Sequence, residues 1–163
     1  MAFVLLISLV IGWRIGEILL SRRNEKWLLA HGAVEYGKEH YPFMVALHVL
    51  FIISVIVEYS LQQPTSYSTI LIVCYMLLLA LKTWPIASLG KFWCTKIYRI
   101  PGLPLITRGP YAYIKHPNYM IVAAEIVVLP LAFRLYDTAI VFTVLNAIIL
   151  AIRIRDENNA LRM

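Results

Sequence analysis

The chain has few charged residues. Only 15% of its 163 residues are charged, whereas a soluble domain of this size carries about 25%. Apolar residues make up 61% of the sequence, and the mean hydropathy is +0.74. A chain this short has room for one domain, so the apolar excess indicates a membrane environment rather than a large soluble core. We therefore expect residues 1–163 to form a single membrane-embedded domain.

Several chemical motifs are also missing. The two cysteines, Cys74 in an apolar stretch and Cys94 in a basic loop, do not suggest a disulfide framework. The four histidines include no i, i+4 pair and no adjoining cysteine, so no metal site is predicted. The chain has no G-x-S-x-G, G-x-G-x-x-G or G-x-x-x-x-G-K-[ST] motif, which argues against a nucleophile elbow, a Rossmann fold or a P-loop. The net charge of +6 comes without a basic run interleaved with aromatics, so nucleic-acid binding is not expected.

Five apolar segments are present instead, and they predict an all-α integral membrane bundle of about five transmembrane helices. The last two are each fifteen residues long and would reach about 22 Å, less than the hydrocarbon thickness of about 30 Å. They are either two spans in a thinned region or a tilted helical hairpin, and we expect two spans. The segments are Ala2–Leu20, Phe43–Leu61, Ser68–Leu89, Tyr119–Phe133 and Thr138–Ile152.

Basic residues alternate between the connections. The first connection carries four, the third carries five and the C-terminal tail carries three, against none in the second and only Arg134 in the fourth. This is the bias expected when the basic loops stay in the cytoplasm. The pattern predicts a multi-pass cell-membrane protein with its N-terminus outside and its C-terminus cytoplasmic.

The first apolar segment and the polar stretch after it suggest how this part of the chain is arranged. Gly12 and Gly16 form a GxxxG motif, which allows close approach of a neighbouring backbone. We expect that neighbour within the monomer, with a dimer seam as the alternative, and the oligomeric state is left open. Residues 21–42 are too polar to span, and Trp27 beside charged residues suggests an interfacial helix.

Charged side chains inside the apolar segments need partners. Arg14 and Glu17 are three residues apart and are expected to form an ion pair. Lys82 and Glu125 are a second possible pair, although Glu125 could instead line a pocket. Glu58 lies near the outer end of its segment, where it is expected to reach water.

The densest polar chemistry lies in the loop RGPYAYIKHPNY, residues 108–119, and in the tail RIRDEN, residues 153–158. If the last two segments form an adjacent antiparallel pair, their cytoplasmic ends meet. His116 through Tyr119 would then face the tail. We therefore predict one site at the membrane edge, built from two stretches that are distant in sequence.

The side chains of this loop and tail suit a polar ligand. Tyrosines can stack on an aromatic ring or lie over a cation, although these could equally form an aromatic interface belt. Arg153 and Arg155 can clasp a carboxylate, and Glu157 can accept from ribose hydroxyls or an ammonium group. The alternative is that the tail merely anchors the chain at the membrane surface.

The stretches LGKFWCTKI, PLITRGPYAYIKHPNY and RIRDENNAL together resemble the isoprenylcysteine carboxyl methyltransferase family. The segment RIGEILLSRRNEKWLLAHGAVEYGKEHYPFMVALH further resembles a short bacterial branch, which is associated with type III polyketide synthases and with alkylpyrone methylation. The resemblance spans nearly the whole chain. The H-P-x-Y loop together with the tail is its most specific part.

The resemblance implies a membrane enzyme that uses S-adenosylmethionine and divides the chain into helices one to three, residues 1–89, and a cofactor-binding part, residues 90–163. Arg153, Arg155 and Glu157 are the predicted catalytic residues. Lys115 stands where arginine is commoner in the family, Asn158 replaces a second glutamate, and the tail stops at Met163. The predicted cofactor-binding residues are Leu105, Ile106, Tyr111, His116, Pro117, Asn118, Tyr119 and Glu157.

The function that the resemblance implies is O-methylation of a carboxyl or acidic hydroxyl group on a lipophilic small molecule, either isoprenylcysteine-like or alkylpyrone-like. A polyketide synthase pathway is the expected source of an alkylpyrone, and membrane lipid surrounds the enzyme. The alternatives are a phospholipid- or sterol-type methyltransferase and a non-catalytic lipid-binding membrane protein.

Overall fold

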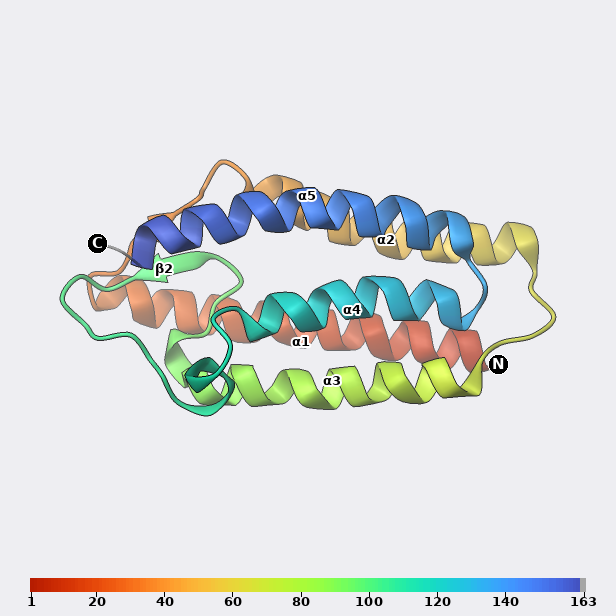
Figure 1. The fold of residues 1–163 in the computed structure, drawn as a ribbon, viewed down its shortest axis with the longest axis horizontal. Coiled ribbons are helices and arrows are strands. Elements are labelled where there is room, and N and C mark those ends of the chain that lie inside the picture. The colour runs from red at the N-terminus through yellow and green to blue at the C-terminus, as the bar shows by residue number, and fades with distance from the viewer. Residues whose placement is uncertain (162–163) are drawn as a thin grey trace.

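The protein is an elongated bundle of helices in a computed structural model that describes residues 1–161 (Figure 1). All five helices run along the long axis, and a two-stranded sheet lies at one end. The elements in chain order are α1 Ala2–Ala30, β1 Val34–Tyr36, α2 Tyr41–Gln62, α3 Thr69–Leu89, η1 Gly90–Phe92, β2 Ile97–Arg99, η2 Gly109–Ala112, α4 Pro117–Ala132 and α5 Tyr136–Leu161.

Four segments are long and apolar enough to cross a membrane: Ala2–Ala30, Tyr41–Gln62, Thr69–Phe92 and Tyr136–Ala160. The remaining helix, α4, has 16 residues and is therefore about 24 Å long. It packs against both α3 and α5. The predicted all-α membrane bundle is confirmed, and α4 is its short member.

The loops divide between the two ends of the bundle (Figure 1). The C-terminal ends of α1, α3 and α5 lie at one end together with β1, β2 and the loop before α4, and we call this the polar end. The N-terminus and the α2–α3 loop lie at the other end. The three basic connections of the sequence thus share the polar end, while Arg162 of the tail lies outside the described residues.

The structure corrects the bounds of two helices. There is no separate interfacial helix over residues 21–42, because α1 continues without a break to Ala30 and β1 follows it. The last helix is also longer than the apolar segment Thr138–Ile152, because it continues through the charged tail to Leu161. Hydropathy marks where a helix leaves the membrane, whereas backbone hydrogen bonding continues into water.

Two further expectations were wrong. Gly12 and Gly16 have no other atom within 4 Å of the position of an added Cβ, so no neighbouring helix packs on them. Glu58 does not reach water, because it is buried and its carboxylate accepts hydrogen bonds from the backbone N–H groups of Asp137 (3.3 Å) and Thr138 (2.8 Å). Glu58 therefore caps the first turn of α5.

The charged residues inside the bundle form one network of four. Arg14 pairs with Glu17 at 3.0 Å, as predicted. Lys82 pairs with Glu125 at 3.2 Å, which confirms the second expected pair. The two pairs are joined, because Arg14 also contacts Glu125 at 2.7 Å and Lys82 contacts Glu17 at 2.7 Å. Two cations and two carboxylates thus offset one another where α1, α3 and α4 meet.

The small sheet fixes the polar end. Strands β1 and β2 are antiparallel, with Val34 opposite Arg99. Next to them, Lys96 contacts Glu25 of α1 at 2.6 Å, and the Tyr98 hydroxyl donates to the same carboxylate at 2.7 Å. These contacts tie the segment that follows η1 to the end of α1.

Candidate active site

The loop and tail meet at the polar end, as the sequence predicts. Helix α4 begins at Pro117, whose fixed φ suits the first helical position. A short turn joins α4 to α5, in which Arg134 adopts a φ of 60°. The two helices pack as an antiparallel pair (Figure 1), so the beginning of α4 lies beside the end of α5.

Glu157 is the centre of the contacts between them. Its Oε2 atom accepts a hydrogen bond from the Tyr119 hydroxyl at 2.5 Å and lies 3.4 Å from Nδ1 of His116. Within residues 1–161, no side chain or backbone group donates to its other oxygen, Oε1. One face of the carboxylate is therefore held by protein, and the other is open to a donor.

His116 is held through both ring nitrogens. Nε2 lies 3.3 Å from Oδ1 of Asn158, while Nδ1 faces Glu157. Because both partners are oxygen acceptors, the ring satisfies both contacts only as the imidazolium. The hydrogen bond with Glu157 accordingly raises the pKa of His116 above its ordinary value, in spite of the opposing effect of burial.

Arg153 is turned into the protein. Its exposure is 4%, and its Nε donates to the Tyr119 hydroxyl at 3.1 Å. Nη2 donates to the Thr95 carbonyl at 2.6 Å, and Nη1 lies 2.6 Å from Sδ of Met44. The guanidinium also lies over the Tyr119 ring, 5.2 Å from its centroid. All three of its nitrogens are engaged, so the geometry supports a role in positioning Tyr119, and the predicted catalytic role of Arg153 stays a prediction.

The other predicted residues surround this group to different degrees. Arg155 has 81% of its side chain exposed and lies 3.9 Å from Asp156. Among residues 1–161, no hydrogen bond or ion pair joins it to Glu157. Tyr111 lies in η2, and burial together with the charge of Glu157 raises its pKa. Pro117 is buried and Asn118 is half-buried. The Oδ1 atom of Asn118 is buried without a hydrogen-bond partner among the described residues.

Leu105 and Ile106 lie in the loop between β2 and η2, where Leu105 is exposed and Ile106 is half-buried. Among residues 1–161, no hydrogen bond connects this stretch to Glu157. The end of the loop is held against α3, because Arg108 Nε donates to the Ser88 carbonyl at 2.8 Å. A Cβ at Gly109 would also clash with Ser88. The predicted role of Leu105 and Ile106 in binding the cofactor stays a prediction.

Sequence reasoning missed three residues next to this site. Thr95 and Met44 contact Arg153, and His40 lies 3.1 Å from Asp156, one residue before Glu157. No motif marks any of them. The only available signal was the position of Thr95 in the basic third connection and of His40 beside the predicted start of the second apolar segment.

The fold and site define a class of protein: a helical membrane bundle with a polar, partly buried binding site at one end. The isoprenylcysteine carboxyl methyltransferase family matches residues 69–163, which include every residue of the site described above except Met44 and His40. The chain belongs to this family, and membership supports a membrane methyltransferase.

Two relatives extend the similarity to nearly the whole chain. An uncharacterized protein of Bacillus subtilis, YpbQ, is 39% identical over 162 residues, covering 98% of this chain and 96% of that protein. An uncharacterized protein of Haemophilus influenzae is 31% identical over 155 residues, covering 93% and 90% respectively. No solved structure matches this chain. The resemblance inferred from the motifs is thus confirmed at the level of the family and of bacterial relatives.

Proposed function

We propose that the protein is an S-adenosylmethionine-dependent methyltransferase that O-methylates a carboxyl or acidic hydroxyl group of a lipophilic substrate. The observation that carries this proposal is the convergence of His116, Tyr119 and Glu157 at one end of a membrane bundle. A water-soluble cofactor and a membrane-dissolved acceptor can both reach such a place. The family to which the chain belongs supports the methyl-transfer chemistry.

The residues present fit this cofactor. Its ribose and amino groups need acceptors, and Oε1 of Glu157 and Oδ1 of Asn118 are acceptors that no described group satisfies. Its adenine needs an aromatic or apolar surface, and the Tyr111 ring lies half-buried near Glu157. When bound, S-adenosylmethionine supplies an electrophilic methyl group on a sulfonium centre.

The protein side chains hold and align rather than exchange protons. A carboxylic acid has a pKa of about 4.3, so a carboxylate acceptor is already ionised at neutral pH and no general base is required. Oε2 of Glu157 in any case already contacts Tyr119 and His116. Fixing the acceptor oxygen in line with the methyl group removes much of the entropic cost of the reaction. Exclusion of water at the membrane edge removes part of the hydration shell of the charged acceptor oxygen and makes it more nucleophilic.

We place the site on the cytoplasmic side, because the basic connections share the polar end with it. The lipophilic acceptor then enters from the membrane and the cofactor from the cytoplasm. An alkylpyrone from a polyketide synthase pathway and an isoprenylcysteine are the two acceptor types proposed. Because the guanidinium of Arg153 is engaged, Arg155, whose side chain is 81% exposed, is the described arginine of the tail that is more accessible to the acceptor.

A transfer assay tests this function. Detergent-purified protein is given S-adenosylmethionine with a labelled methyl group and one of four acceptors. Two are the proposed types, an alkylpyrone and a farnesylcysteine analogue, and two are comparisons, a phospholipid and a sterol. We expect at least one of two products: a base-labile methyl ester from the farnesylcysteine analogue, or a methyl enol ether from the alkylpyrone. Glu157→Gln should lower kcat/KM by about 10–100-fold, the value of a hydrogen bond to a charged group.

The matched control is Glu39→Gln, which removes an exposed carboxylate from the same end of the bundle and should leave kcat/KM unchanged. Transfer only to a phospholipid or sterol acceptor would contradict the proposed substrate class. No transfer to any of the four acceptors would contradict the proposed activity.

A further inference from the structure

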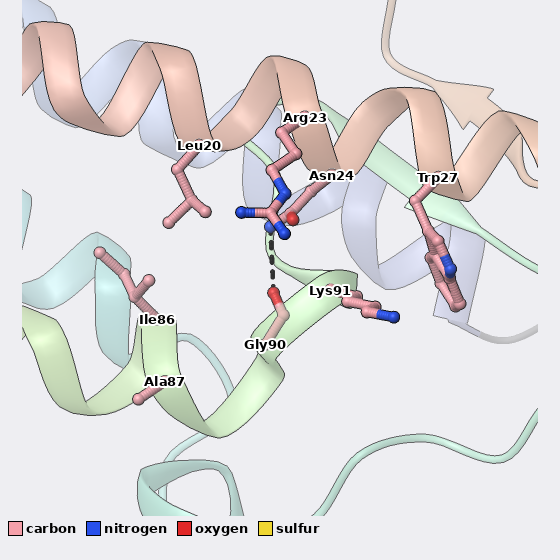
Figure 2. Close-up of a pocket in the computed structure, with 8 residues that line it drawn as sticks. All are labelled: Leu20, Arg23, Asn24, Trp27, Ile86, Ala87, Gly90 and Lys91. Carbon is pink, nitrogen blue, oxygen red and sulfur yellow. Dashed lines mark hydrogen bonds between the residues drawn. The ribbon is translucent and has the colours of Figure 1, made fainter.

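A cavity opens at the polar end, away from the residues around Glu157. It lies between the C-terminal ends of α1 and α3 and has a volume of about 420 Å³ (Figure 2). Its lining residues are Leu20, Arg23, Asn24, Trp27, Ile86, Ala87, Gly90 and Lys91. None of them belongs to the predicted cofactor site.

The lining is ordered by depth in the membrane. Helices α1 and α3 end at the same end of the bundle, so a higher residue number on either helix means a position closer to water (Figure 1). Leu20 and Ile86 are therefore the deeper lining residues, and Arg23 and Lys91 are the shallower ones. From Leu20 to Trp27 the helix rises by about 10 Å. The lining of the cavity thus changes from apolar to cationic along a direction that matches a phospholipid, from its first acyl carbons to its phosphate.

The two cations at its mouth are available to an anion. Among residues 1–161, neither Arg23 nor Lys91 forms an ion pair with a carboxylate. Lys91 instead lies over the Trp27 ring, 5.5 Å from its centroid, and the Arg23 guanidinium extends from α1 toward Gly90 (Figure 2). By contrast, Lys96 at the same end is paired with Glu25.

The floor between these cations is rigid. Asn24 donates from Nδ2 to the carbonyl of Gly90 at 3.0 Å and to the carbonyl of Trp93 at 2.7 Å, and these bonds fix η1 against α1 (Figure 2). The backbone segments that carry Arg23 and Lys91 are therefore held next to each other by these bonds. Indole rings such as that of Trp27 favour the headgroup level of a membrane.

We propose that this cavity binds one anionic phospholipid, with its phosphate between Arg23 and Lys91 and its glycerol and first acyl carbons against Leu20 and Ile86. Basic pockets between membrane helices at the cytoplasmic surface are suited to such headgroups. The charge complementarity and the apolar-to-cationic order of the lining identify the occupant as a lipid rather than a free anion. The proposal does not depend on the proposed methyl transfer.

Native mass spectrometry of the full chain in micelles doped with phosphatidylglycerol or phosphatidylcholine tests it. We expect one phosphatidylglycerol to remain bound preferentially. Each basic residue near an anionic surface contributes about a factor of five in affinity, so the double variant Arg23→Gln/Lys91→Gln should weaken retention by about 30-fold.

The matched control is Arg22→Gln/Lys26→Gln, which removes the same charge from exposed positions of α1 that do not line the cavity. It should retain the lipid as the parent does. A second variant, Ala87→Phe, fills the cavity without changing charge and should also weaken retention. Thermal unfolding checks that each variant is folded.

Equal losses in the two charge variants would show only diffuse attraction to the basic surface and would overturn the proposal. So would equal retention of the two lipids by the parent, or full retention by Ala87→Phe.

Discussion

At the scale of single residues, His116 and Glu157 depend on each other's charge. The imidazolium donates to the carboxylate, and this bond raises the pKa of His116 above its ordinary value of about 6.5. A group whose pKa is higher in the folded state stabilises the fold most fully below its unfolded pKa. That contribution is lost as the pH rises through the folded pKa. Lys115, the neighbouring cation, acts in the opposite direction.

A pH series on His116→Gln tests this dependence. We expect the variant to be less stable than the parent by about 1 kcal/mol at pH 6, because one partly exposed charged hydrogen bond is lost. The difference should shrink steadily toward pH 9. Thermal unfolding in detergent measures it, with Tyr113→Phe, an exposed change in the same loop, as the control. A difference that grows with pH would contradict the assignment of an imidazolium.

The residues of the site were predictable to different degrees. The meeting of His116 and Tyr119 with Glu157 follows from the antiparallel pairing of the last two apolar segments, together with a continuation of α5 through the tail that hydropathy did not predict. The inward turn of Arg153 does not, because it depends on the Thr95 carbonyl and on Met44, which come from other parts of the fold. An arginine in a basic tail looks the same in sequence whether its guanidinium faces a ligand or the protein.

At the scale of elements, the network of Arg14, Glu17, Lys82 and Glu125 joins α1, α3 and α4. Pairing within each helix or between neighbours was predictable from the need to offset charge in a membrane. That the two pairs share partners was not, because the rotation of each helix about its axis is set by packing. The burial of Glu58 was also not predicted, because its capping of α5 requires α2 and α5 to be neighbours, and the sequence does not show which helices are adjacent.

Charge deletion in this network should be strongly destabilising. Lys82→Met leaves three charges with a net negative charge in a site where Lys82 and Glu125 are each 1% exposed. We expect a loss of about 3–5 kcal/mol. The double variant Lys82→Met/Glu125→Gln leaves the neutral Arg14–Glu17 pair and should recover more than half of that loss.

Thermal unfolding in detergent measures both variants, and Thr83→Val, an exposed neighbour on α3, should change stability little. If the double variant is no more stable than Lys82→Met, the four side chains do not act as one network.

At the scale of the whole molecule, the order of the helices places the candidate active site and the cavity between α1 and α3 at the same end of the bundle. The alternating basic connections predicted five crossings, and the structure has five helices with those connections at a single end (Figure 1). The helix ends were predicted less well. Both α1 and α5 continue well past their apolar segments, because polar residues that leave the membrane still favour helix. That extension of α5 is what brings Glu157 beside α4.

The most direct test of the account is calorimetric titration of the detergent-purified protein with S-adenosylhomocysteine, the demethylated form of the proposed cofactor. We predict binding by the parent and by Glu39→Gln, and affinity at least tenfold weaker for Glu157→Ala and His116→Ala, since each removes a charged hydrogen-bonding group of the site. Absence of binding by the folded parent protein would contradict the proposed cofactor, and equal affinities in all four proteins would contradict the placement of its site.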